Sequence, residues 1–353
     1  MTGADMQIAE IEVQGALQEL YGCGRTGRGR SRLSEVTLLG SGYEADVFAF
    51  SLAAGAGEAE ALVLRLYAGE GAGEKAEREY WALRRLRAAG YPVPAARLFR
   101  RERSPLGRPF VVMERIDGVN LAATYWPAKG EEHRALAVLL YRLIAGLQAL
   151  DAGAILPESP LAGTCDPYAA IDQEIANLAR LLDRLQGSEP PSLHGVLAWL
   201  AERRSHVPCE RVVAIHGDFH PGNVLLGAGV APTVIDWSNL RLGDYRAELA
   251  WTRLVTGAGV PPGRAEVELR VYEELMGKPV PEIEVFDVAA CARLLLSVLN
   301  SLHFGAARQG LRAEAEARMR QDVGFTRRIA ARLQALTGRR MPDLDDALSA
   351  LLE

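Results

Sequence analysis

Two short segments near the middle of the chain carry the side chains best suited to chemistry. Residues 216–223 read His-Gly-Asp-Phe-His-Pro-Gly-Asn, and Asp236 follows thirteen positions after Asn223. Each segment lies beside a run of apolar, β-type residues, so each is expected at the end of a strand. The Asp218 carboxylate can orient a hydroxyl, while the Asn223 amide and the Asp236 carboxylate are hard oxygen ligands that suit Mg²⁺. The order of these residues is therefore the one required to align a hydroxyl and to hold a magnesium ion.

Two other interpretations of the segment remain open. His, Asp and Asn side chains after a strand can simply form hydrogen bonds within a turn. If the segment were a strand, alternation would place His216, Asp218 and His220 on one face, where they could bind a transition metal. Gly217 and Pro221 favour a loop instead, and no other histidine-rich segment completes such a site.

These residues resemble the catalytic and metal-binding loops of the aminoglycoside phosphotransferase and choline kinase family, whose fold is like that of protein kinases. The family pattern H-x-D-x-x-x-x-N is matched by His216, Asp218 and Asn223, and its later metal-binding Asp by Asp236. The resemblance implies that Asp218 is the catalytic residue that aligns the substrate hydroxyl. It also implies that Asn223 and Asp236 bind Mg²⁺ and that His216 braces the loop.

The resemblance extends from about residue 38 to residue 251. Residues 243–251 are similar to the family's G-D-x-x-x-D-L-A segment, with Glu248 where that pattern usually has Asp. Asp244 is expected to cap the helix that follows, because Asp is favoured at the N-cap position.

The expected nucleotide-binding residues lie upstream. Gly40, Ser41 and Gly42 lie between two predicted strands, where backbone N–H groups would lie over a triphosphate. A plain hairpin turn also explains this glycine pair. Within the predicted strand 62–66, Arg65 stands where the family has a lysine that contacts the α- and β-phosphates. Arginine keeps the charge but is longer and planar, and a surface arginine on an edge strand is the alternative interpretation.

The expected partner of Arg65 is a carboxylate on the helix predicted over residues 74–89. Glu79 matches the family's R-E-x-x-A-L helix best, and Glu77 is the alternative. The chain thus differs from the family at the cation, where Arg65 replaces lysine, and matches it at the carboxylate partner.

Residues 113–118 resemble the hinge after which the family's chain enters its second lobe. Backbone groups of Glu114 to Ile116 would contact the edge of the adenine ring. Because backbone recognition leaves almost no side-chain signature, ATP is the expected nucleotide and GTP remains possible.

The composition is that of an ordinary globular protein and limits the possible partners. The chain has 353 residues, of which 49% are hydrophobic and 24% charged, so it can form two lobes, each with its own core. A net charge of −5 argues against a nucleic-acid partner. The four cysteines have no metal or disulfide spacing. With no signal-peptide pattern and no apolar run long enough to span a bilayer, we expect a cytoplasmic protein without a membrane partner. Its oligomeric state stays open.

The elements that must position these residues follow a two-part pattern. A leading helix is expected over residues 5–21, and the arginine-rich segment 25–32 is either a solvated linker or a phosphate contact. Further elements of the first part are the strands 36–39, 47–50, 61–66 and 110–113 and the helix 74–89. The second part has helices over 131–150, 167–185, 192–204, 265–275, 285–304 and 313–336, and strands over 212–215 and 233–236. We therefore predict an α+β, protein-kinase-like two-lobe fold, with a small β-rich N-lobe over residues 1–116 and a large, mostly helical C-lobe over 117–353.

The resemblance implies an ATP- and Mg²⁺-dependent transfer of the γ-phosphate to a hydroxyl of a small molecule, either an aminoglycoside-like antibiotic or an amino or sugar metabolite. Acidic residues of the helical part, Asp172 and Glu174 among them, could attract an amino group or lie on a solvated helix face. A nucleotide-binding pseudokinase or scaffold is the alternative, supported by Arg65 and the imperfect glycine loop. A protein kinase is disfavoured because no Ala-Pro-Glu segment or long activation loop follows Asp236.

Overall fold

The computed structural model describes residues 3–22, 31–42, 44–54, 57–101, 105–227, 231–257, 263–309, 311–312 and 315–352. They form two compact units: Met1–Gly118 with Gly227–Ser238 and Ala306–Ala315 in the first, and Val119–Leu226, Asn239–Gly305 and Glu316–Glu353 in the second. Most of the predicted arginine-rich segment, Cys23 and Tyr43 of the glycine loop lie outside the described residues.

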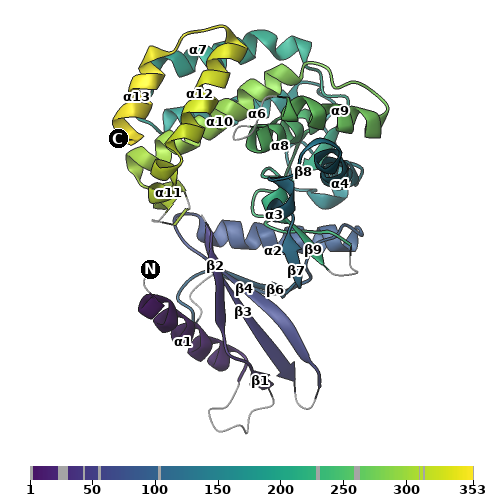
Figure 1. Ribbon diagram of the computed structural model, residues 1–353, viewed down its shortest axis with the longest axis vertical. Coiled ribbons are helices and arrows are strands. Elements are labelled where there is room, and N and C mark those ends of the chain that lie inside the picture. The colour runs from purple at the N-terminus through teal and green to yellow at the C-terminus, as the bar shows by residue number, and fades with distance from the viewer. Residues whose placement is uncertain are drawn as a thin grey trace. The chain divides into compact units, whose positions relative to one another are not determined.

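An antiparallel sheet dominates the first unit. Its strand order is β1-β3-β4-β6-β5. Strand β1 pairs with the C-terminal end of β3, and β2 pairs with the N-terminal end of β3. The strands are β1 (Ser31–Leu33), β2 (Thr37–Ser41), β3 (Ala45–Ala54), β4 (Ala59–Tyr67), β5 (Ala96–Arg100) and β6 (Phe110–Glu114). The unit also contains α1 (Gly3–Leu20), α2 (Ala72–Ala88), β10 (Thr233–Val234) and the 3₁₀ turn Ala306–Gln309. Figure 1 shows α1 lying alongside the long strands.

The side chains of strand β4 alternate between the two faces of this sheet. Its residues Leu62, Leu64 and Leu66 are buried in one core cluster with Val13 and Leu17 of α1. Successive side chains of a strand point to opposite faces, so the intervening positions of β4 face α2 instead. The position of Arg65 on the α2 face therefore follows from the register of one strand.

The second unit is mostly helical (Figure 1). Its helices are α3 (Ala122–Tyr125), α4 (Gly130–Gln148), α5 (Ala152–Ile155), α6 (Ala169–Asp183), α7 (Pro191–Arg203), α8 (Tyr245–Gly257), α9 (Arg264–Met276), α10 (Ile283–Phe304), α11 (Ala315–Gln321), α12 (Val323–Thr337) and α13 (Pro342–Leu352), with 3₁₀ turns at Arg204–His206 and Pro221–Asn223. Its short strands are β7 (Gly118–Asn120), β8 (Val212–Ile215), β9 (Val224–Gly227) and β11 (Arg241–Asp244), and β8 pairs with β11.

Helix α10 is the core helix of this unit and packs against α6, α7, α8, α12 and α13. The expectation that no apolar run is long enough to span a bilayer was wrong for this helix, which is long and apolar enough by length and composition, but 83% of its apolar window is buried inside the protein. A helix that is apolar on all sides is expected in the centre of a helical unit. Burial by its neighbours thus accounts for its composition.

The predicted α+β fold class is confirmed, with a β-sheet first part and a mostly helical second part. The long helix predicted over residues 313–336 was wrong in one respect, because it is two helices, α11 and α12, with Asp322 at the start of the second. Helices α3, α5 and α13 and strands β1, β5, β7, β9 and β11 were not predicted. Strand β5 follows two prolines and carries Arg97 and Arg100, which obscures its apolar alternation.

Candidate functional site

The first unit brings Arg65 together with two carboxylates. Arg65 Nη1 lies 2.5 Å from Glu79 Oε1, and Nη2 lies 2.9 Å from Asp236 Oδ1. Glu77, the alternative partner, pairs with Arg101 at 2.7 Å near the surface. The arginine therefore joins β4, α2 and the segment after β10, and the plain surface-arginine interpretation is wrong.

Glu79 is the buried centre of this cluster, with no exposed surface. Its Oε1 also accepts the Trp237 N–H at 3.1 Å, and its Oε2 accepts the Tyr67 hydroxyl in a short hydrogen bond. Burial raises the pKa of Glu79 to about 7, while the Arg65 charge opposes that rise. Burial by itself would lower the pKa of Arg65, but Asp236 and Glu79 raise it above its ordinary value. The arginine is a fixed cation held by two carboxylates.

Asp236 occupies a backbone conformation that only a minority of residues adopt. Its φ is +69°, in the left-handed region that costs a non-glycine residue about 1–3 kcal/mol. Its Oδ1 accepts a hydrogen bond from Ser238 Oγ at 3.3 Å in addition to that from Arg65. One third of the Asp236 side chain is exposed, so this carboxylate is held in a defined place while remaining accessible.

The glycine segment is more regular than predicted. Gly40 and Ser41 belong to β2, where they pair with Val47 and Asp46, rather than to a turn. The Gly42 N–H donates to the Ala45 carbonyl at 2.9 Å, which closes the hairpin.

Glu44, next in this hairpin, contributes an anchor that the sequence did not predict. Its carboxylate lies 2.7 Å from Lys75 Nζ of α2 and accepts the Ser238 hydroxyl at 2.9 Å. Glu44 thus connects the glycine hairpin to the segment that carries Asp236.

Glu114 ends strand β6. Its N–H donates to the Ala95 carbonyl at 2.9 Å, and the next N–H, that of Arg115, donates to the Ala61 carbonyl at 3.0 Å. These two donors are therefore used within the sheet. Ile116 lies one residue beyond them, at the end of the paired region.

In the second unit, the chain leaves β8 through a turn that requires glycine. Gly217 has a φ of +81°, and a Cβ atom there would lie 2.8 Å from the Asn239 carbonyl oxygen. The N–H groups of His216 and Gly217 both donate to the carboxylate of Glu248 on α8, the latter at 3.2 Å. His216 Nδ1 in turn accepts the Asp218 N–H at 3.2 Å. Glu248 and His216 therefore brace the loop, as was predicted for the histidine alone.

The Asp218 carboxylate is oriented by an indole and an imidazole. Its Oδ1 accepts Trp251 Nε1–H at 2.8 Å, and its Oδ2 lies 3.7 Å from His220 Nε2. Burial by itself would raise the pKa of this carboxyl, but the nearby imidazole of His220, followed by His216 and the Trp251 hydrogen bond, holds it well below its usual range. Asp218 is therefore an ionised hydrogen-bond acceptor with one third of its side chain exposed.

Asn223 is fixed by the same loop. Its Nδ2 donates to the Asp218 carbonyl oxygen at 2.9 Å and lies 3.3 Å from His220 Nε2. With the amide nitrogen directed into the loop, the amide oxygen is the atom available to a hard cation.

The loop geometry argues against one of the two alternative interpretations of the segment, the transition-metal site. Residues 216–223 form a loop and a 3₁₀ turn rather than a strand. Within the described part of the chain, no group of three or more His, Cys, Asp or Glu side chains could hold a metal ion, so the transition-metal interpretation finds no support. Asp244 caps α8 as predicted, because its Oδ1 accepts the Arg246 N–H at 2.9 Å.

Two residues beside Asp218 were not predicted as site residues. Trp251 donates to Asp218, and the guanidinium carbon of Arg293 lies 3.5 Å from the centre of the Trp251 ring. Arg293 also donates to the Gly217 carbonyl at 2.6 Å. The available signal was a lone arginine within the apolar sequence of α10.

Comparisons with known structures reveal a common fold. The chain is similar to aminoglycoside phosphotransferase APH(4)-Ia, with a TM-score of 0.58 and 20% identity, covering 94% of this chain and 99% of that chain. It is also similar to a choline/ethanolamine kinase family protein from Mesorhizobium loti, with a TM-score of 0.58 and 16% identity, covering 96% and 98% of the two chains. At these identities the likeness shows the protein-kinase-like fold alone.

Sequence comparison extends the similarity to two curated proteins. Acyl-CoA dehydrogenase family member 11 of Gallus gallus is 27% identical over 179 residues, which are 50% of this chain and 22% of that protein. Acyl-CoA dehydrogenase family member 10 of Mus musculus is 26% identical over 182 residues, or 50% and 16% of the two chains. The match thus covers less than a quarter of the length of either relative.

A family model described as "Phosphotransferase enzyme family" matches residues 35–281, more than half of the chain. The matched range contains the glycine hairpin, the Arg65 cluster and the loop that carries Asp218 and Asn223. The chain belongs to the phosphotransferase enzyme family.

Proposed function

We propose that this protein is an ATP- and Mg²⁺-dependent kinase that transfers the γ-phosphate to a hydroxyl group of a small molecule. The observation that carries the proposal is the Asp218 carboxylate, which is ionised, partly exposed and oriented by Trp251 and His220. A phosphotransferase needs mainly to position its reactants and to offset charge. A fixed carboxylate can accept a hydrogen bond from the acceptor hydroxyl and take its proton as the phosphorus–oxygen bond forms.

The Arg65 cluster supports binding of a nucleotide. Arg65 would contact its phosphates from β4, aligned by Glu79, and the N–H groups of Gly40, Ser41 and Gly42 would lie near the same phosphates. The Ile116 backbone, with the Glu114 carbonyl, would contact the base. A neighbour of the same fold, a thermostable mutant of APH(4)-Ia, is a ternary complex with ADP and hygromycin B. Another neighbour is a GDP complex of an aminoglycoside 2'-phosphotransferase, so GTP remains an alternative donor.

Two residues, one in each unit, carry oxygen atoms that each suit a magnesium ion. Asn223 offers a neutral amide oxygen and Asp236 an exposed carboxylate, and both are hard oxygen ligands of the kind that Mg²⁺ takes together with phosphates and water. A bound Mg²⁺ would offset the charge of the phosphates. The left-handed backbone of Asp236 agrees with a functional position, because strained residues cluster at such sites.

The experiment is an assay of phosphorylated product by mass spectrometry, with ATP or GTP, with and without Mg²⁺, over a panel of hydroxyl compounds. Asp218→Asn is the test variant. Glu210→Gln is the matched control, because Glu210 is a carboxylate at the surface of the second unit, where it pairs with Lys278. We expect Mg²⁺-dependent product with the wild type and the control, and a loss of at least 100-fold in turnover for Asp218→Asn.

Two results would contradict the proposal. Full activity of Asp218→Asn would remove the assigned role of this carboxylate. Nucleotide binding without product from any acceptor, together with cellular function that survives Asp218→Asn, would favour the pseudokinase or scaffold instead.

A further inference from the structure

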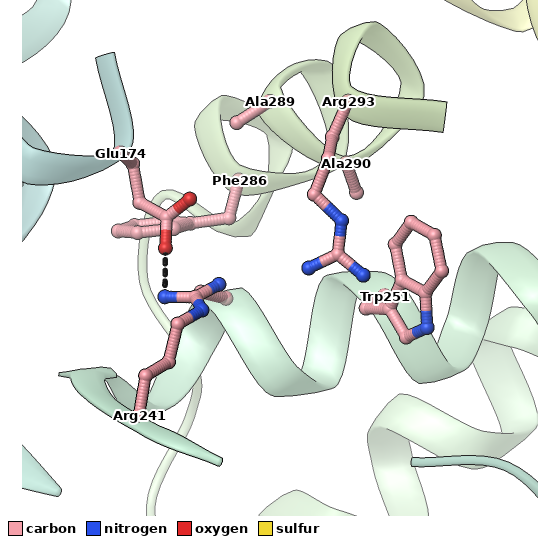
Figure 2. Close-up of a pocket in the computed structure, with 8 residues that line it drawn as sticks. Glu174, Arg241, Trp251, Phe286, Ala289, Ala290 and Arg293 are labelled. Atoms are coloured by element: carbon pink, nitrogen blue, oxygen red, sulfur yellow. Dashed lines mark hydrogen bonds and ion pairs between the residues drawn. The ribbon is translucent and has the colours of Figure 1, made fainter. Parts of the chain in front are cut away.

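A line of three side chains connects helix α10 with the Asp218 carboxylate. The guanidinium carbon of Arg293 lies 3.5 Å from the centre of the Trp251 ring, and Figure 2 shows this guanidinium group beside the ring. The indole nitrogen of Trp251 donates to Asp218 Oδ1 at 2.8 Å. All three residues belong to the second unit. A cation is therefore linked to the Asp218 carboxylate through a single indole.

The order of charges along this line strengthens the hydrogen bond at its end. A cation over the face of an indole is attracted by the electron density of the ring, and tryptophan is the most favourable aromatic partner. Because the cation draws this density towards the ring face, the N–H group at the ring edge becomes more positive and donates better. Adjacent polar interactions polarise one another in this way. We therefore expect the Trp251 N–H to hold the Asp218 carboxylate more firmly than an isolated indole would.

Arg293 remains a cation in this position. Burial, and then the charge of Arg241, lower the pKa of Arg293 to about 10. The negative charges of Glu174, Asp218 and Glu248 oppose that fall. Since this pKa lies well above 7, the guanidinium group is protonated at neutral pH. Its charge is therefore available to polarise the indole.

The hydrogen bond from Trp251 distinguishes the two oxygen atoms of the Asp218 carboxylate. Oδ1 accepts the indole N–H, whereas Oδ2 lies 3.7 Å from His220 Nε2, which is longer than a hydrogen bond. One third of the Asp218 side chain is exposed. Because the bond at Oδ1 opposes rotation of the carboxylate, Oδ2 keeps a defined direction. Oδ2 is therefore the oxygen suited to accept a hydrogen bond from a hydroxyl.

Arg293 also contacts the loop by a second path. Its Nη2 donates to the carbonyl oxygen of Gly217, the residue before Asp218, at 2.6 Å. Loss of Arg293 can thus reach Asp218 through the indole or through the backbone. The two paths predict different results, because only the first requires the Trp251 N–H.

We propose that Trp251 and Arg293 are positioning residues for Asp218: Arg293 strengthens the hydrogen bond from the Trp251 indole to Oδ1, and this bond directs Oδ2 at the acceptor hydroxyl. The consequence for catalysis rests on the proposed kinase function. In that reaction the acceptor oxygen bonds to the γ-phosphorus of ATP, the bond from that phosphorus to the bridging oxygen breaks to release ADP, and Oδ2 takes the hydroxyl proton. Trp251 and Arg293 take no part in these bond changes.

The first test examines the hydrogen bond in the ligand-free protein and needs no kinase activity. Protein with isotope-labelled tryptophan gives NMR signals for its indole N–H groups, and the signal that disappears in Trp251→Phe belongs to Trp251. A strong hydrogen bond to a carboxylate moves such a proton signal downfield. Arg203→Met is the matched control, because the Arg203 guanidinium carbon lies 3.8 Å from the centre of the Trp199 ring, on α7 of the same unit.

We expect the Trp251 proton signal to move upfield in Asp218→Asn, because an amide is a weaker acceptor than a carboxylate. It should also move upfield in Arg293→Met, because the indole loses its cation, and less so in Arg293→Lys, which keeps a charge. Arg203→Met should leave the Trp251 signal unchanged. A Trp251 signal that does not respond to Asp218→Asn or to Arg293→Met would overturn the proposal.

The second test is a double-mutant cycle in the phosphorylation assay. Trp251→Phe keeps an aromatic ring but has no N–H donor, so kcat should fall about tenfold or more while the Kd for ATP stays within about twofold. Arg293→Met should also lower kcat. The double variant should be about as slow as Trp251→Phe alone, because Arg293 acts through the indole. Arg203→Met should keep wild-type turnover.

Thermal unfolding shows that each variant is folded before turnover is compared, and Arg293→Lys takes the place of Arg293→Met if the latter does not fold. Wild-type turnover in Trp251→Phe would overturn the proposal. Losses that multiply in the double variant would also overturn it, because Arg293 would then act through the Gly217 carbonyl. Absence of product from the wild type, with the NMR shifts as expected, would contradict the proposed kinase function and leave the polarised hydrogen bond established.

Discussion

Replacement of Arg65 by methionine tests whether the cluster in the first unit is a buried, coupled charge system. The Glu79 carboxylate has no exposed surface, and 11% of the Arg65 side chain is exposed. Removing one partner of a buried ion pair leaves an uncompensated charge and typically costs about 3–5 kcal/mol. Above pH 7, where the Glu79 carboxyl of the wild type is ionised, we therefore expect Arg65→Met to lower the free energy of unfolding by about 3–5 kcal/mol.

The double variant Arg65→Met/Glu79→Gln supplies the control. The glutamine amide that replaces the Glu79 carboxylate carries no charge, and it can still accept the Trp237 N–H and share a hydrogen bond with the Tyr67 hydroxyl. Since replacing a whole buried ion pair is often nearly neutral, the double variant should lie within about 2 kcal/mol of the wild type.

Urea denaturation followed by circular dichroism and tryptophan fluorescence measures these differences, and the double-mutant cycle gives the coupling free energy. A loss below about 1 kcal/mol in Arg65→Met would show that the charges are not coupled in this way, because it is smaller than the cost expected for a buried, unpaired carboxylate. The same conclusion would follow if Arg65→Met/Glu79→Gln were no more stable than Arg65→Met.

Three further predictions concern the same two units. Burial raises the pKa of Glu79 to about 7, so the folded state binds this proton more tightly than the unfolded state. The free energy of unfolding should therefore fall as pH rises from the ordinary glutamate range to about 7. Urea denaturation across that interval should show that the free energy of unfolding of Glu79→Gln depends less on pH. Gly217→Ala adds a Cβ atom 2.8 Å from the Asn239 carbonyl oxygen at a φ of +81°, so calorimetry should show a loss of about 1–3 kcal/mol, and an unchanged melting temperature would contradict the assigned strain. Glu248→Gln keeps the size of the side chain but weakens the acceptor of two buried N–H groups, those of His216 and Gly217. We expect the free energy of unfolding to fall by about 1–3 kcal/mol, and turnover to fall while the KM for ATP stays unchanged. Full turnover in this variant would show that the loop does not need the Glu248 carboxylate.

The loop that carries Asp218 was predictable from sequence because its residues contact one another over short separations. A strand was predicted over residues 212–215 and is present as β8. Asp218 and Asn223 are five residues apart, and their hydrogen bond belongs to the same loop. Local geometry alone therefore places the side chains that the motif specifies.

The partner of Arg65 shows where sequence reasoning reaches its limit. Glu77 and Glu79 are two positions apart on α2, and two residues of an α-helix differ by about 200° around its axis. Only one of them can face β4, and the choice depends on how the helix packs. The structure selects Glu79, which the sequence could only prefer through the family pattern.

The residues that contact Asp218 or its loop could not be predicted from the sequence, for a different reason. Glu248, Trp251 and Arg293 come from α8 and α10, far along the chain from the loop. Their helices were predictable, but the rotation of each helix about its axis is fixed by packing against its neighbours. In the sequence, Arg293 was only an interruption of an apolar run.

The proposed nucleotide site is tested most sharply by a calorimetric titration of the protein with ATP, in the presence and absence of Mg²⁺, comparing the wild type with Asp236→Asn. Removing the carboxylate charge weakens a hard oxygen ligand without changing its size. We predict saturable, Mg²⁺-dependent binding to the wild type and at least tenfold weaker binding to Asp236→Asn. Binding that is equally tight without Mg²⁺, or unchanged in the variant, would contradict the assignment of this residue and of the nucleotide site.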